Sequence, residues 1–240
     1  MIEKEQQLLA QVLDLFAQKF DKKAVLRGGM VLCVLGSPRL TNDLDYVFVP
    51  YKSKKDIVDE ILTCLRSIDG AQLDYSLNSK CLRVILTVEQ TSIQIESKVA
   101  MDVKTTTTST RLFSTRFNLP PRIIHVVDTN VALANKMAAW NERRLIRDIY
   151  DIWFLLQMHA TPDEATLQSR LLKPVYSSLV KKEDYFTGQT RGDFYDFIRS
   201  YVSSLSDEQI SNELSDYLPP SETAGLALLF KAAFTKLRPS

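Results

Sequence analysis

Two short motifs decide how this chain folds: Leu26-Arg27-Gly28-Gly29 and, after thirteen intervening residues, Asp43-Leu44-Asp45-Tyr46. The apolar residues before the glycines predict a strand, and the glycines interrupt it. The apolar run from Met30 to Leu35 then predicts a short helix that ends at Gly36. From Asp43 to Val49 the side chains alternate with period two, so this run predicts a second strand, which Pro50 ends.

The glycines and acids of these motifs have the chemistry of a phosphate and metal site. At a strand-to-helix junction, Gly28 and Gly29 let the backbone approach phosphate oxygens, and the first N–H groups of the helix face those oxygens. Asp43 and Asp45 stand two residues apart on one strand, so both carboxylates leave the same face. Together they can bind a divalent cation such as Mg²⁺ or Mn²⁺.

A third carboxylate on a neighbouring strand would complete a two-metal site for in-line phosphoryl transfer. The β-rich run from Ile93 to Val103 offers two candidates, Asp102 and Glu96. They are six residues apart, an even number, so both would face the same side of an unbroken strand. We take Asp102 as the third metal ligand and keep Glu96 as its rival.

Each motif alone also has a more ordinary interpretation. A lone Gly-Gly is more often a turn than a phosphate cradle, and a lone Asp-x-Asp is usually a solvated strand face or a turn. The joint pattern favours catalysis, because glycines that follow a strand, an apolar helix and acids that open the next strand occur here in one order.

A second informative stretch lies on helices predicted at 129–143 and 147–158. On one continuous helix Lys136, Arg143 and Arg147 would share a face, since they are seven and four residues apart. That face could hold a triphosphate, with Lys136 as a point charge against the β and γ oxygens. Two alternatives remain open: a solvated basic face, and a segment from Arg147 to Asp151 that caps and salt-bridges two helices.

Composition describes a protein with an ordinary core in a reducing compartment. The chain has 240 residues, of which 45% are hydrophobic and 25% charged, and the formal net charge of +1 gives no global basicity. Three cysteines without paired spacing predict free thiols. The first residues lack a signal-peptide layout, and no apolar run approaches the ~20 residues that span a bilayer. We therefore expect a cytoplasmic protein with no membrane association.

The predicted secondary structure changes after Pro120-Pro121, from a mixture of strands and helices to helices. We therefore predict an α+β chain with a core at 1–125 and a helical C-terminal domain at 126–240. The other elements expected in the core are helices at 2–19 and 53–68, a hairpin of 81–88 with 93–103, and either a strand or a loop at 105–110. The further helices expected are 163–172, about 192–205, 207–217 and 222–236.

Taken together, these motifs resemble the AbiEii/AbiGii-type nucleotidyltransferases, toxins of bacterial toxin–antitoxin and phage-defence systems. The resemblance covers roughly residues 24–157 and is narrowed by the residues Lys136, Arg143 and the run from Arg147 to Asp151. It implies a polymerase β-like nucleotidyltransferase core, in which a mixed β-sheet is flanked by helices. It also implies a divalent metal, a nucleoside triphosphate (NTP) as co-substrate and a cognate antitoxin.

The resemblance also assigns roles to single residues. Asp43 and Asp45 match the acids that bind metal, Lys136 matches the lysine of the family, and Asp148 matches its later essential acid. Arg39 falls where the family often has an arginine before the acid pair. The helical domain would thus contribute Lys136 and Asp148 to the cleft. The sequence departs from the pattern just before the acids, where Thr41-Asn42 stands.

The sequence therefore predicts a metal-dependent transfer of a nucleoside monophosphate from an NTP to an acceptor. Some relatives extend the 3′ end of tRNA, which makes RNA the expected acceptor. The alternatives are nucleotidylation of a protein hydroxyl, a kinase that uses the same metal site, and a silent nucleotide-binding module. The donor base and the oligomeric state stay open.

Overall fold

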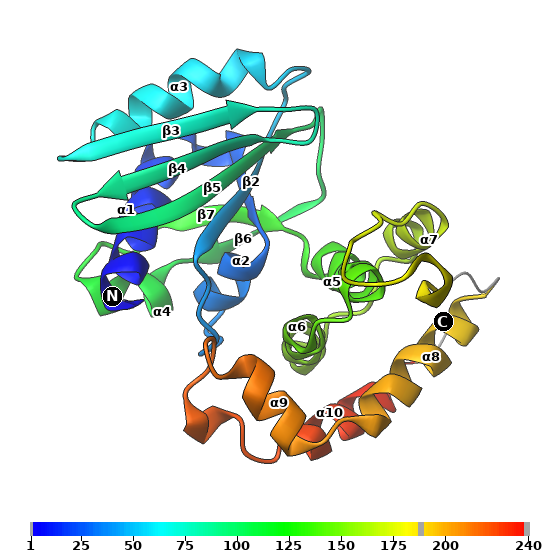
Figure 1. Cartoon of the computed structure of the whole chain (residues 1–240). Coiled ribbons are helices and arrows are strands. Elements are labelled where there is room, and N and C mark those ends of the chain that lie inside the picture. Colours follow the sequence, from blue (N-terminus) through cyan, green and yellow to red (C-terminus); the bar gives the residue numbers. More distant parts are fainter. Residues whose placement is uncertain (1, 187–189, 238–240) are drawn as a thin grey trace. The chain divides into compact units, whose positions relative to one another are not determined.

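The acid pair opens strand β2 (Asp43–Phe48), the middle strand of a seven-stranded mixed sheet in this computed structural model (Figure 1). The structure describes residues 2–186 and 190–237. The strand order is β3-β4-β5-β2-β1-β7-β6. The other strands are β1 (Ala24–Arg27), β3 (Ala71–Leu77), β4 (Leu82–Val88), β5 (Thr91–Val99), β6 (Thr105–Ser109) and β7 (Ile123–Val127). The predicted mixed sheet flanked by helices is confirmed.

Alternation along β2 determines which face of the sheet becomes the core. Leu44, Tyr46 and Phe48 are buried, and the rings of Tyr46 and Phe48 pack against Phe16 and Phe20 with centroids 5.1 and 5.0 Å apart. These two phenylalanines belong to helix α1 (Ile2–Phe20), which packs with α3 (Lys55–Arg66) on this face of the sheet (Figure 1). Asp43 and Asp45 consequently project from the opposite face.

Two strands of the sheet were missing from the sequence prediction. β3 is an edge strand with mostly exposed side chains, so it has no clear alternation to detect. β7 is a short apolar run without alternation, in a stretch that we interpreted as a boundary. The run at 105–110, left open above, forms β6 and pairs with β7 in antiparallel orientation.

The predicted hairpin forms as β4 and β5, but β5 ends at Val99 and not at Val103. Val99 pairs with Phe48, the last residue of β2, so no partner strand remains for the residues that follow. Asp102, the expected third carboxylate, therefore lies outside β5.

The chain divides into two compact units, Met1–Asp128 and Thr129–Ser240. The first unit keeps β7 whole, because the division falls after Asp128, whereas a boundary at 125 would cut that strand. Besides the sheet, this unit contains the helices α1, α2 (Gly29–Val34), α3 and α4 (Arg111–Ser114).

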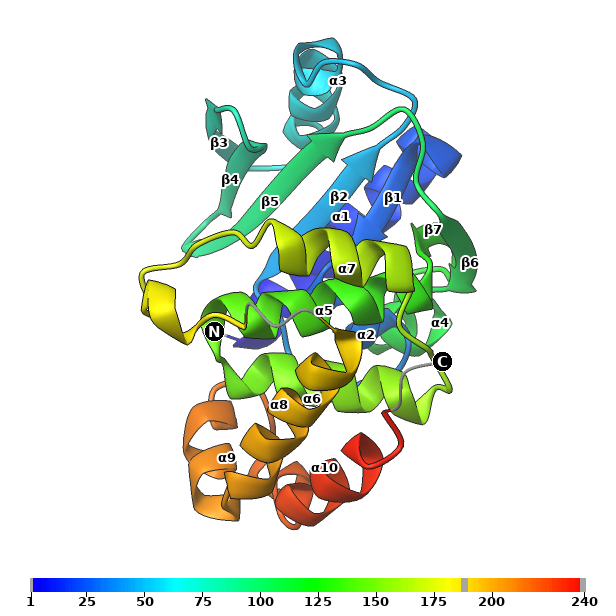
Figure 2. The same ribbon diagram turned by 90° about the vertical axis from the view of Figure 1, so that its right-hand side faces the viewer.

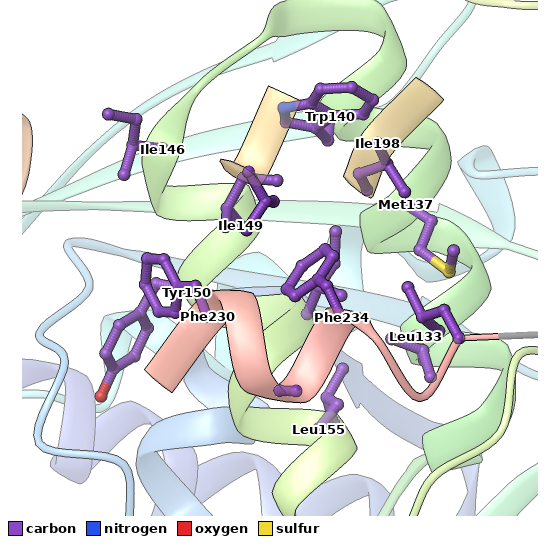
Figure 3. Packing of buried hydrophobic residues seen from close by; sticks show 14 of the residues in the cluster. Leu133, Met137, Trp140, Ile146, Ile149, Tyr150, Leu155, Ile198, Phe230 and Phe234 are labelled. Atoms are coloured by element: carbon purple, nitrogen blue, oxygen red, sulfur yellow. The ribbon is translucent and has the colours of Figure 1, made fainter. Parts of the chain in front are cut away.

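The second unit is helical. Its helices are α5 (Thr129–Arg143), α6 (Ile146–Gln157), α7 (Glu164–Leu172), α8 (Arg191–Ser204), α9 (Asp207–Leu214) and α10 (Leu226–Phe234). α5 lies between α6 and α7 (Figure 2). The core of this unit contains Trp140, Tyr150, Phe230 and Phe234, and the rings of Tyr150 and Phe230 pack with centroids 6.5 Å apart (Figure 3). Across the two described ranges, no helix is both long and apolar enough to cross a bilayer.

Two of these helices are shorter than expected. The last begins at Leu226 and not at 222, because Gly225 lies at its N-terminus with φ +74° in a left-handed conformation that a helix cannot continue through. α9 ends at Leu214, three residues before the expected end.

Candidate active site

The turn between β1 and α2 presses its backbone against the acid pair. Gly28 has φ +76° and ψ −153°, a region that is essentially restricted to glycine. A Cβ atom at this position would lie 2.3 Å from Oδ2 of Asp45. The strand-to-helix turn and the second acid are therefore in direct contact, and only a residue without a side chain allows that contact.

The next glycine makes room for the residues that hold the first acid. A Cβ atom at Gly29 would lie 2.9 Å from both Nη2 of Arg39 and Oγ1 of Thr41. The Thr41 hydroxyl donates a hydrogen bond to Oδ1 of Asp43 at 2.7 Å, and the Thr41 carbonyl accepts one from Nε2 of Gln6 at 2.6 Å. Thr41 stands where the sequence departs from the family pattern, and its hydroxyl positions the acid.

The predicted residues of the first unit are thus brought together. Arg39 is buried, with Nη1 donating to the Leu40 carbonyl at 2.9 Å. Its guanidinium lies beside Gly29. Arg39 and the two acids therefore lie around the turn that the two glycines form. The site thus combines a buried positive charge, a turn whose backbone other groups can approach closely, and two carboxylates on one strand face. Such a combination can bind a triphosphate together with its metal ion.

Beyond these residues, a row of charged side chains crosses four neighbouring strands on the face that carries the acids. Arg27 of β1 is the register partner of Asp45, Asp45 pairs with Glu96 of β5, and Glu96 pairs with Arg83 of β4. We call this surface the acid face and define it by Asp43, Asp45, Glu96 and the three basic residues Arg27, Arg83 and Lys98. Partners in register project from the same face, so these side chains are neighbours.

Glu96 is held by hydrogen bonds to one of its two oxygens. Oε1 accepts from Nη2 of Arg83 at 2.8 Å, from Nε of Arg83 at 3.1 Å and from Nε2 of Gln94 at 3.2 Å. Arg83 therefore fixes the glutamate on the strand next to Asp45.

The structure does not bring Asp102 to this place, which corrects our choice of third ligand. β5 ends at Val99, which pairs with Phe48 at the far end of β2 from Asp43. Asp102 follows that end, is exposed, and its Oδ1 accepts a hydrogen bond from the Val103 N–H at 2.8 Å. The argument from even spacing failed because the strand does not continue to Asp102. Glu96, the rival, is the carboxylate in register with Asp45.

The site offers two protein carboxylates to a metal ion. Within residues 2–186 and 190–237, no three histidine, cysteine, aspartate or glutamate side chains gather into a group that could hold a metal ion. Mg²⁺ usually takes one or two carboxylates from the protein and its other ligands from water and substrate phosphates. Asp43 and Asp45 fit that requirement, and Glu96 is available from the next strand.

Sequence reasoning missed three basic residues of the acid face. Burial lowers the pKa of Lys98, the charge of Arg27 lowers it further, and the carboxylate of Asp45 opposes both effects. A signal was present, because Gln94, Glu96 and Lys98 are the polar positions of an alternating strand whose other positions are apolar or small.

The predicted basic residues of the second unit are engaged within that unit. Nζ of Lys136 lies 2.5 Å from Oδ2 of Asp151, which is fully buried. Arg143 of α5 makes a bidentate pair with Asp148 of α6, with Nη2–Oδ1 at 2.6 Å and Nε–Oδ2 at 3.1 Å. Nη1 of Arg147 donates to the Tyr217 hydroxyl at 3.0 Å. The alternative of salt bridges between two helices therefore describes Arg143 and Asp148.

The Arg143–Asp148 pair should contribute measurably to stability. We expect Asp148→Asn to lower the free energy of unfolding by about 1–3 kcal/mol, because a charge-assisted bidentate pair at a buried carboxylate is lost. The matched control is Asp196→Asn, since the 70% exposed Asp196 pairs with Arg199 on the surface; its effect should stay below about 0.5 kcal/mol. Denaturant unfolding followed by tryptophan fluorescence measures both variants, as Trp140 and Trp153 lie in this unit. Equal, small losses would contradict this structural role.

Together, the glycine turn, the acid pair on the neighbouring strand and the mixed sheet define the class of protein as a nucleotidyltransferase. The structure is similar to that of MenT4, a nucleotidyltransferase toxin from Mycobacterium tuberculosis, at 17% identity and a TM-score of 0.56, over 98% of this chain and 85% of that one. It is also similar to JHP933 from Helicobacter pylori, at 14% identity and a TM-score of 0.54, over 96% of this chain and 90% of that one. At these identities the likeness concerns the fold.

The family follows from the sequence. The family described as nucleotidyl transferase AbiEii toxin, type IV toxin–antitoxin system, matches residues 8–212. The chain therefore belongs to the AbiEii nucleotidyltransferase toxins, as the resemblance predicted. Membership implies an NTP substrate and an antitoxin partner. No curated protein matches the sequence.

Proposed function

We propose that this enzyme transfers a nucleoside monophosphate from an NTP to the 3′ end of an RNA of the tRNA class, with Mg²⁺ as the metal. The observation that carries the proposal is the contact between the Gly28 turn and Asp45, together with the hydroxyl of Thr41 on Asp43. These contacts hold two carboxylates beside a turn whose backbone can approach phosphate.

In the proposed reaction, the acceptor hydroxyl oxygen attacks the α-phosphorus in line, and the bond from that phosphorus to pyrophosphate breaks. Asp43 and Asp45 would hold the metal, which supplies positive charge to the triphosphate and the leaving group. We assign the third carboxylate to Glu96, which lies in register with Asp45. It is the residue that takes the proton of the acceptor hydroxyl.

We further propose roles for two residues of the helical unit: Lys136 as a point charge that binds phosphate, and Asp148 as an acid that the family requires. Both side chains have partners in the unit, Asp151 and Arg143. Those ion pairs fix the two side chains in place, which supports a positioning role in addition to a stabilising one. Arg143 and Arg147 do not share one helix, because α5 ends at Arg143 and α6 begins at Ile146. We keep both as proposed contacts for nucleotide phosphates.

The acceptor is identified by labelling. Purified protein is incubated with Mg²⁺, each α-³²P-labelled NTP in turn and total bacterial RNA. We expect label in a band of tRNA size, removed by RNase and resistant to protease. Label that survives RNase and disappears with protease would instead establish a protein acceptor and contradict the RNA assignment.

The two candidates for the third carboxylate should behave differently. We expect Glu96→Gln to lower kcat by about a hundredfold, because the residue in register with Asp45 can no longer accept a proton. Asp102→Asn should leave kcat within about twofold, since Asp102 is exposed beyond the end of β5. Single-turnover kinetics with saturating NTP measure both variants, and the reverse order of effects would restore Asp102.

We place the reaction in the cytoplasm, where NTPs, RNA and a cognate antitoxin meet. All three cysteines lie in the described part of the chain, are buried and form no disulfide there, which suits a reducing compartment.

A further inference from the structure

We propose that Arg27 and Lys98 form a phosphate-binding subsite on the acid face, on either side of Asp45. The proposal rests on the proposed function and adds to it a place where a phosphate of the donor or of the acceptor strand is held. It involves only the sheet of the first unit.

Register places the two cations beside the second acid. Arg27 is the partner of Asp45 on one side, in β1. Lys98 lies two residues beyond Glu96 on β5, on the other side of β2, and its own partner is Val47. Because side chains alternate, all of these residues project from the same face. Arg27 and Lys98 are close enough for their positive charges to repel each other, and the negative charge of Asp45 attracts Lys98.

The ion pairs of the protein distinguish these two cations from Arg83. Over residues 2–186 and 190–237, the hydrogen bonds and ion pairs of the protein leave out the side chains of both Arg27 and Lys98, although both are half-buried. Arg83, the third cation of the acid face, is different because it is bound to Glu96. Two like charges at partly buried positions destabilise a fold unless an anion joins them.

The balance of charges around a site that has bound a metal ion indicates the chemistry of that anion. Around the turn and the acid face lie four cationic side chains, Arg27, Arg39, Arg83 and Lys98, and three carboxylates, Asp43, Asp45 and Glu96. A divalent cation on the acid pair would neutralise carboxylate charge that now faces Lys98. Arg27 and Lys98 would then require negative charge from outside the protein. A phosphate oxygen next to the reacting centre would supply this negative charge. The guanidinium of Arg27 and the ammonium group of Lys98 both bind phosphate oxygens well.

Two sources offer this chemistry: the triphosphate of the donor and the internucleotide phosphate of the acceptor nearest its reacting hydroxyl. Two binding probes distinguish them, a non-hydrolysable NTP analogue with Mg²⁺ and a 5′-fluorescein-labelled single-stranded RNA. The variants are Arg27→Gln and Lys98→Gln, with Lys98→Arg as the version that keeps the charge. The matched control is Arg66→Gln, because Arg66 is exposed on α3, which packs on the other face of the sheet.

We expect each glutamine variant to weaken the binding of one probe by about tenfold, while Lys98→Arg and Arg66→Gln stay within about twofold. If the RNA probe responds, the slope of log Kd against log salt should also fall by about one, which assigns the phosphate to the acceptor. If only the nucleotide analogue responds, the phosphate belongs to the donor. Thermal melts by circular dichroism establish that each variant folds.

The subsite is overturned if folded Arg27→Gln and Lys98→Gln bind both probes as tightly as the unmodified chain does. In that case the proposed function stands, because the unmodified chain still binds nucleotide and RNA. If the unmodified chain binds neither probe, the proposed function and the subsite both fail.

Discussion

Replacing Asp45 by asparagine is expected to slow nucleotide transfer by at least about a thousandfold while the chain still folds. Asparagine keeps the volume of the side chain that touches Gly28 but removes the negative charge that would hold the metal. The loss should appear in kcat, because a carboxylate that holds the metal acts mainly on the transition state. The measurement is incorporation of α-labelled nucleotide at saturating NTP.

The matched control for this variant is Asp74→Asn. Asp74 is an exposed acid on the edge strand β3 of the same sheet, and its partner across the sheet is Ile85 of β4. Its replacement removes the same charge at a distance from the acid pair, so kcat should stay within about twofold. If Asp45→Asn keeps more than about a tenth of the activity, the acid pair does not hold the metal as we propose.

Replacing Gly28 by alanine is expected to remove activity and to lower the free energy of unfolding by about 3 kcal/mol or more. Two effects add at this position: a backbone conformation that side chains rarely adopt, and a Cβ atom placed 2.3 Å from Oδ2 of Asp45. The new methyl group must displace the carboxylate or the turn, so stability and catalysis fall together. Circular dichroism in denaturant and the transfer assay measure the two losses.

Gly225→Ala is the matched control for this change. Gly225 also has a positive φ, +74°, but a Cβ atom there would meet nothing within 4 Å. The backbone alone should then lower stability by about 1 kcal/mol, and activity should remain. An equal effect of the two substitutions would show that the contact between Gly28 and Asp45 is not the source of the loss.

Local sequence pattern was enough to predict the turn and the acid pair. The period-two alternation of β2 put Leu44 and Phe48 in the core, which forced Asp43 and Asp45 onto the opposite face. The glycines marked the strand-to-helix turn because other residues rarely adopt the conformation of Gly28. Each of these conclusions concerns residues that are close in the sequence.

Pairing between distant strands could not be predicted in the same way. The choice between Asp102 and Glu96 depends on β5 lying parallel to β2 with Glu96 opposite Asp45, and on β5 ending where β2 ends. Arg27 and Lys98 come together only because β1 and β5 both pair with β2. A single charged residue in a strand otherwise indicates an exposed position. Likewise, Lys136 and Asp151 were both noted, but nothing in the sequence identified them as partners.

The central claim, nucleotide transfer at the acid pair, is tested most directly by supplying one NTP in two forms, labelled at the α- or at the γ-phosphate. Each form is incubated with RNA, Mg²⁺ and either the unmodified chain or Asp45→Asn. The account predicts that α-label enters the RNA, that γ-label leaves in pyrophosphate, and that chelation of the metal or loss of Asp45 abolishes both. Transfer of γ-label to the acceptor, or undiminished α-label transfer by Asp45→Asn, would contradict it.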